Sequence, residues 1–193
     1  MRLSIFLVFC VAFAYLATLS ANAQATDGQA TVSPKRGEFI FHDYVAPIPI
    51  NWIALKPSSS MRIAQYRVPA VGSANDAEMV VFFFGQALGG GVQANINRWM
   101  SQFSTEDGKP VAPKTERVEV GGLRVTTVEL RGNYSRGVGT GSQGIAKPNQ
   151  TLLVAIIETP MGNLTFQLHG DHGTVEGHRK SFEAMIRGFG RTI

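Results

Sequence analysis

Two short segments are apolar at every position, and they limit the possible fold more than any other feature of the sequence. Residues Met79–Phe84 read MVVFFF, and residues Leu152–Ile157 read LLVAII. A strand with one face in water alternates apolar and polar side chains, whereas a strand covered on both faces does not. We therefore expect both segments to be central strands of a sheet with other elements packed on each side.

Two stretches with helical periodicity are suited to covering such a sheet. Residues 92–102 and residues 175–189 each place apolar side chains on one helical stripe, with polar residues elsewhere. The first stripe consists of Val92, Ile96, Trp99 and Phe103, and the second of Val175, Phe182, Met185, Ile186 and Phe189. Because a sheet buried on both faces needs two covering layers, we expect these helices to pack on it.

Shorter segments bounded by proline and glycine predict the remaining strands. Gly121-Gly122 predicts a two-residue hairpin turn between two of them. In the last predicted strand, apolar residues 164, 166 and 168 alternate with Thr165, Gln167 and His169, which is typical of a strand with one half-exposed face. The other predicted strands are 39–45, 50–55, 61–68, 116–120 and 123–130. The predicted fold class is α+β, a mostly antiparallel sheet with helices packed on it as an α/β/α sandwich.

The N-terminus has the pattern of a cleavable signal peptide. Arg2 precedes an apolar run over residues 5–17, and Ala21-Asn22-Ala23 is a small-residue cleavage site. A spanning helix needs about 20 apolar residues, more than this run supplies. We expect residues 1–23 to be a signal peptide, 24–37 a flexible lead-in and 38–193 a single α+β domain.

Cysteine content and charge narrow the possible functions. Cys10, the only cysteine, lies in the expected leader, so the mature chain would have no disulfide, catalytic thiol or thiolate–metal site. An exported domain without disulfides is commoner among bacterial periplasmic proteins than among eukaryotic secreted ones, so we expect a periplasmic or secreted bacterial protein. Losing Arg2 with the leader reduces the net charge from +4 to +3, too small an excess to predict nucleic-acid binding.

Two glycine-rich loops are candidate ligand-binding sites. Gly89, Gly90 and Gly91 join a predicted buried strand to a helix N-terminus, where backbone N–H groups attract anions. The P-loop ending Gly-Lys-Ser/Thr does not follow these glycines, so the loop does not predict nucleotide hydrolysis. In the loop over residues 132–144, Tyr134 and Arg136 are the side chains able to reach a ligand. For both loops the alternative is a tight or mobile connection without a binding role.

A third candidate is a metal site formed by His169, Asp171 and His172. Imidazole and carboxylate groups in a short loop are ligands for zinc and other divalent ions, although this spacing fits no established zinc motif. The alternative is structural: His169 is a solvated strand residue, Asp171 or Thr174 caps the last helix, and His178 lies at the margin of the core.

The order of these segments resembles the PsbP-like/Mog1-like α/β/α sandwich family, in particular small exported bacterial members of unassigned role. The resemblance spans roughly residues 38–189. It is carried by Trp52, the MVVFFF strand, the helix around Asn95–Trp99, the LLVAII strand with its Pro160–Gly162 turn, the strand LTFQLHG and the final helix with Phe182 and Met185. Family members with known roles are accessory or binding proteins, including an extrinsic photosystem subunit and a partner of a small GTPase. None of their functional residues maps onto this chain by motif, so the resemblance implies only a fold and a tendency toward an accessory or binding role.

Two functional hypotheses follow. The first is an exported non-enzymatic accessory or binding domain without a cofactor, which binds an unknown protein or a small anionic ligand. It would have no membrane span after leader cleavage and would not bind nucleic acid. The second is a metal-dependent hydrolase that uses His169, Asp171 and His172.

Overall fold

The computed structural model describes residues 31–33, 37–135 and 146–192, and the expected leader lies outside the described residues. Its main feature is an eight-stranded sheet in which all neighbouring strands are antiparallel. The strands in sheet order are β4 (Ile53–Leu55), β5 (Arg62–Val68), β6 (Ala77–Phe83), β11 (Gly162–Asp171), β10 (Lys147–Thr159), β9 (Leu123–Tyr134) and β7 (Phe103–Ser104), with β8 (Lys114–Val120) also paired to β9.

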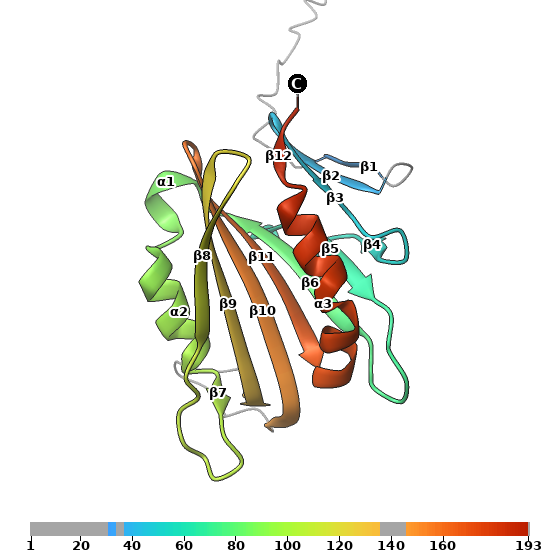
Figure 1. The fold of residues 1–193 in the computed structure, drawn as a ribbon, viewed down its shortest axis with the longest axis vertical. Coiled ribbons are helices and arrows are strands. Elements are labelled where there is room, and N and C mark those ends of the chain that lie inside the picture. Colours follow the sequence, from blue (N-terminus) through green and yellow to red (C-terminus); the bar gives the residue numbers. More distant parts are fainter. Residues whose placement is uncertain (1–30, 34–36, 136–145, 193) are drawn as a thin grey trace, which may run out of the picture.

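A second, four-stranded sheet and three helices complete the described part of the chain. The small sheet has the order β1 (Thr31–Ser33), β2 (Glu38–Phe41), β3 (Tyr44–Pro47) and β12 (Gly190–Arg191). The helices are α1 (Gly85–Leu88), α2 (Val92–Met100) and α3 (His172–Arg187). Figure 1 shows α3 crossing in front of the large sheet, with the small sheet beside its C-terminal end. The predicted α+β class is confirmed.

Strand β10 contributes to a separate hydrophobic core on each face of the sheet, as the LLVAII pattern predicted. One core contains α3 and the small sheet, and the other contains α2. Alternate residues of β10 enter each: Leu153, Ala155 and Ile157 the first, and Leu152, Val154 and Ile156 the second.

Strand β6 is covered less completely than its MVVFFF pattern predicted. Met79 and Val81 are fully buried on the α3 side. On the opposite face Val80 is buried, but Phe82 is only half-buried. The reason is that α2 packs on β9 and β10 and does not extend over β6.

The predicted strand over residues 39–45 is a hairpin, β2–β3, which turns at His42 with a φ of 52°. Trp52 precedes β4, and its indole Nε1–H donates a hydrogen bond to His178 Nδ1 at 3.2 Å. This contact ties the start of the large sheet to α3. In the described segments, no helix is long and apolar enough to cross a membrane.

Candidate functional site

The large-sheet face that carries α2 has an apolar half and a polar half. On β9 and β10 this face presents apolar side chains, which are buried against Ile96 and Trp99 of α2. On the neighbouring strands β11, β6 and β5 the same face carries polar and charged side chains together with Val80 and Phe82 of β6. The change in polarity falls between β10 and β11, where the cover provided by α2 ends.

Strand β11 alternates as predicted. Leu164, Phe166 and Leu168 are fully buried toward α3. Thr165, Gln167 and His169 point to the opposite face, where Gln167 and His169 are half-buried. The half-exposed face therefore belongs to a strand that is paired on both sides, with β6 and β10, and not to an edge strand.

These polar side chains form the floor of a groove with a volume of about 560 Å³. One wall is formed by residues of α2, and the other by residues at and before the start of β5. The lining residues that contribute to the chemistry described below are Arg62, Glu78, Phe82 and Phe84 on one side, Asn95, Arg98 and Gln102 on the α2 side, Gln167 and His169 on the floor, and Tyr134 and Lys147 at the β9–β10 end.

The groove has an excess of positive charge. Its lining includes three cationic side chains, Arg62, Arg98 and Lys147, and one carboxylate, Glu78, which leaves +2 with histidine neutral. Arg62 and Glu78 pair with each other at 2.9 Å, and Gln65 Nε2 also donates to Glu78 Oε1 at 2.7 Å. The excess charge of the lining therefore resides on Arg98 and on Lys147, which also acts electrostatically on Asp171 of the adjoining pocket. This excess favours an anionic ligand.

Aromatic rings are grouped toward the two ends of the groove. Phe82 and Phe84 are stacked, with centroids 6.0 Å apart and planes at 14°. The rings of Tyr134 and His169 pack with centroids 4.3 Å apart. Lys147 lies next to them, because it pairs with Tyr134 in the β9–β10 register. The groove thus presents flat apolar surface at one end and mixed polar groups at the other.

The glycine-loop candidates differ in their position relative to the groove. Gly89 and Tyr134 both line it, although Tyr134, predicted to lie in a loop, is the last residue of strand β9. Gly90 and Gly91 are next to Gly89 but are not among the lining residues. The amide of Asn95 donates to the carbonyl oxygens of Gly89 and Gly91 at 2.8 and 3.1 Å, which ties the loop to α2. Arg136 lies outside the described residues.

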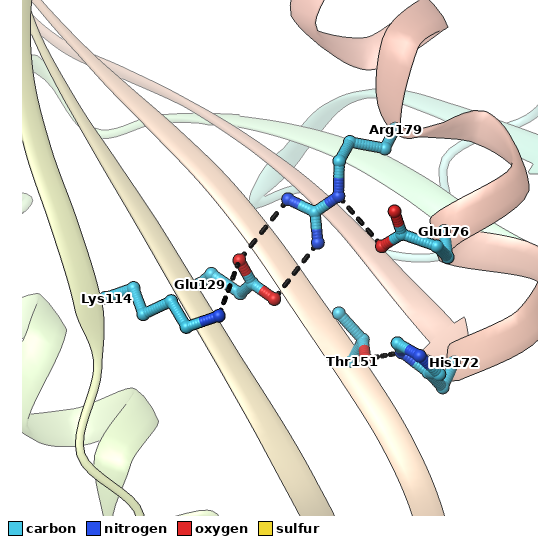
Figure 2. A network of polar contacts seen from close by, with 6 residues as sticks. All are labelled: Lys114, Glu129, Thr151, His172, Glu176 and Arg179. Carbon is cyan, nitrogen blue, oxygen red and sulfur yellow. Dashed lines mark hydrogen bonds and ion pairs between the residues drawn. The ribbon is translucent and has the colours of Figure 1, made fainter.

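The structure does not bring the three metal candidates together. His169 faces the groove, whereas His172 Nδ1 contacts Thr151 Oγ1 at 3.0 Å on the α3 face, as Figure 2 shows. Two histidines on opposite faces of a sheet cannot share one ion. Across the described ranges there is no group of three or more His, Cys, Asp or Glu side chains suited to a metal.

Asp171 takes part in a hydrogen-bond cluster and does not cap α3 with its side chain. Its carboxylate accepts from the backbone N–H and the amide of Asn75 and from the amide of Gln150, at 2.7–2.8 Å. These bonds, that from the Asn75 backbone first and that from Gln150 next, hold the pKa of Asp171 below its usual range. Thr174, the other expected cap, donates instead to the carbonyl of Asn75.

A second pocket of about 1170 Å³ continues from the end of the groove and is lined in part by Asp171. The two cavities share Glu78, Lys147 and His169. These three side chains therefore form the boundary between the groove and a wider opening at the end of the sheet.

Most of the groove residues were not identified from the sequence. Arg62, Glu78, Arg98 and Lys147 lie far apart in the chain and match no motif. The one sequence signal for the groove was the polar face of β11, where Gln167 and His169 alternate with buried residues in a strand next to LLVAII. A polar row in such a position indicates a face that the covering helix leaves open.

No protein-family model matches the sequence, and no curated protein matches it. Similar solved structures include a protein of unknown function from Pseudomonas aeruginosa, with 16% identity, a TM-score of 0.46 and coverage of 83% of this chain and 95% of that one. Another is cyanobacterial PsbP from Synechocystis, with 15% identity, a TM-score of 0.49 and coverage of 91% and 99%. A protein from Bacteroides thetaiotaomicron has 14% identity, a TM-score of 0.42 and coverage of 86% and 49%. These similarities concern the fold alone.

Proposed function

We propose that this chain is an exported accessory domain that acts by binding a small anionic ligand in the groove between α2 and the open half of the sheet. The observation that carries the proposal is that polar residues of β11 form the floor of one cavity whose walls bring together Arg98 and Lys147 from distant segments of the chain. The groove volume lies in the range of ligand sites, about 300–1,000 Å³. The excess positive charge on Arg98 and Lys147 supports an anion.

Filling the groove tests this proposal. Gln167→Trp places a large ring on the groove floor at a half-buried position, away from both cores. Arg117→Trp places the same ring at an exposed position of β8, outside the groove, as the matched control. Both variants and the wild-type chain would be purified from the envelope fraction and examined by native mass spectrometry after incubation with small-molecule extract.

We expect an added ligand mass in the wild type and in Arg117→Trp, and its loss in Gln167→Trp. Circular dichroism would show that all three chains are folded. Equal ligand occupancy in Gln167→Trp, or no ligand mass in any of the three, would contradict a binding role for the groove.

Export is a separate part of the proposal and rests on the leader pattern of residues 1–23. Expression of the full chain in a Gram-negative host should yield a periplasmic protein whose N-terminal residue is Gln24. Intact mass would identify the cleavage point. A chain that keeps all 193 residues and stays with the membrane fraction would refute it.

A further inference from the structure

We infer that the ligand is an amphipathic anion whose charged group lies at Arg98 and whose flat apolar part lies on Phe82 and Phe84. The inference rests on the proposed function and names the chemical class of the ligand. It follows from the position of one cation on the side of the groove that carries exposed aromatic rings.

The apolar end is defined by the stacked pair Phe82 and Phe84 with Met61, all of which line the groove. Met61 is 59% exposed and Phe82 and Phe84 are half-buried, so their apolar surface is open to a ligand. Exposed aromatic surface inside a cavity favours a flat ring or a chain packed against it.

The charged group of the ligand is assigned to Arg98, which pairs with no carboxylate among the described residues. Arg98 donates to the amide oxygen of Asn95 at 2.6 Å, and the amide nitrogen of Asn95 donates to the carbonyl of Gly89. Gly89 packs beside Phe84, so this cation lies on the side of the groove that carries the rings. Lys147 acts electrostatically on Asp171, and Arg62 is paired with Glu78, so both contribute less attraction.

The strand register separates the rings from the Lys147 boundary. Phe82 of β6 lies opposite Thr165, and Glu78, which lines that boundary with Lys147, lies opposite His169. Four residues along a strand span roughly 13 Å. A ligand that lies on Phe82 and Phe84 therefore has Arg98 as its nearer cation, and Lys147 is secondary.

Two fluorescent probes that differ in one group test the inference. Anilinonaphthalene sulfonate has the two parts expected of the ligand, and N-phenylnaphthylamine has the same rings without the sulfonate. We expect saturable binding of the sulfonate at one site per chain. The uncharged probe should bind about tenfold more weakly, a difference of about 1.4 kcal/mol.

Variants assign the charged and the apolar parts of the site. Arg98→Gln should weaken sulfonate binding about threefold to tenfold and leave the uncharged probe unchanged, and Lys147→Gln should weaken it less. Phe84→Leu should weaken both probes. Lys180→Gln removes the same charge from the exposed side of α3 and is the matched control, with no expected effect.

The outcomes separate this inference from the proposed function. Saturable binding of both probes with equal affinity, or an effect of Lys180→Gln as large as that of Arg98→Gln, would overturn the amphipathic-anion inference and leave the groove as a binding site. No saturable binding of either probe to the folded protein would overturn the inference, while the native mass experiment decides the proposed function independently.

Discussion

At the scale of the residue, Asp171 was predicted from the sequence to be a metal ligand, but its side chain has a structural role. Its carboxylate joins the turn before β6, the start of β10 and the start of α3 through bonds from Asn75 and Gln150. A carboxylate stabilised in this way favours its charged form in the folded state.

Asp171 should therefore contribute to acid sensitivity. Because its folded-state pKa lies below its usual range, its stabilising effect is complete above the unfolded pKa, near 3.9, and is lost as the pH falls through the folded value. We expect Asp171→Asn to unfold more easily at pH 7 by about 1 kcal/mol, and to lose less stability than the wild type between about pH 5 and pH 2. Urea unfolding at a series of pH values measures both. Parallel stability–pH curves for the two chains would contradict this role.

At the scale of the element, the β10–β11 turn closely approaches the start of α1. Gly162 has a φ of 130°, and a Cβ atom there would overlap the backbone of Gly85. Gly122 in the β8–β9 turn also has a positive φ, 75°, but its missing Cβ would meet nothing within 4 Å. An alanine at Gly122 would therefore meet backbone strain alone, whereas an alanine at Gly162 would meet backbone strain and a steric overlap.

We expect Gly162→Ala to lower the free energy of unfolding by more than about 2 kcal/mol, and Gly122→Ala to lower it by about 1 kcal/mol. Thermal and urea unfolding of the two variants make the comparison. Since the overlap is with the chain that leads to the groove wall, Gly162→Ala should also shift the amide resonances of residues 85–91. Equal costs for both substitutions would mean that the approach to Gly85 is not tight.

Helix α3 is attached to the sheet by an ion pair that Figure 2 shows in detail. Both terminal nitrogens of Arg179 contact the two carboxylate oxygens of Glu129, at 3.0 and 3.3 Å, and Arg179 Nε donates to Glu176. Burial acts to lower the pKa of Arg179, but the hydrogen bonds with Glu176 and Glu129 outweigh it and raise the pKa. Glu129 is 19% exposed, so the pair is largely shielded from solvent.

Removing Arg179 should therefore matter more than removing an exposed arginine of the same helix. We expect Arg179→Met to lose about 1–3 kcal/mol, because Glu129 would remain largely buried without its main cation. Arg187→Met removes the exposed ion pair to Glu183 at 3.6 Å and should cost less than about 0.5 kcal/mol. Denaturant unfolding compares them, and similar losses would contradict a special role for the Glu129 pair.

At the scale of the whole molecule, the two hydrophobic cores share the strands of one sheet. Trp52 belongs to the core under α3, and Trp99 to the core under α2. Because alternate residues of β10 enter both cores, neither core can lose its packing without disturbing the strand that supports the other.

The two tryptophans make this coupling measurable. Trp52→Phe leaves Trp99 as the only indole, and Trp99→Phe leaves Trp52. In each variant we expect the fluorescence transition in urea to coincide with the far-ultraviolet circular dichroism transition of the same variant. A midpoint that differs between the two probes by more than the experimental error would show that one core opens before the other.

Local periodicity determined much of the architecture. The continuous apolar run LLVAII predicted a strand buried on both faces, and the alternation of Thr165, Gln167 and His169 predicted a half-exposed one. Both were confirmed because the two-residue period of a strand depends only on nearby side chains. The hairpin turn at Gly121-Gly122 was predictable for the same reason, with φ values of 56° and 75°.

Only the tertiary structure decided which sheet strands α2 covers, and with that the existence of the groove. The apolar stripe of α2 shows which face is buried but not that its partners are β9 and β10, so the partial exposure of Phe82 could not be predicted. The meeting of Arg62 with Glu78, and of Arg98 and Lys147 at one cavity, depends on pairings between strands distant in the chain. The separation of His169 from His172 follows from the strand ending at Asp171 and the helix starting at His172, which put the two imidazoles on opposite faces of the sheet.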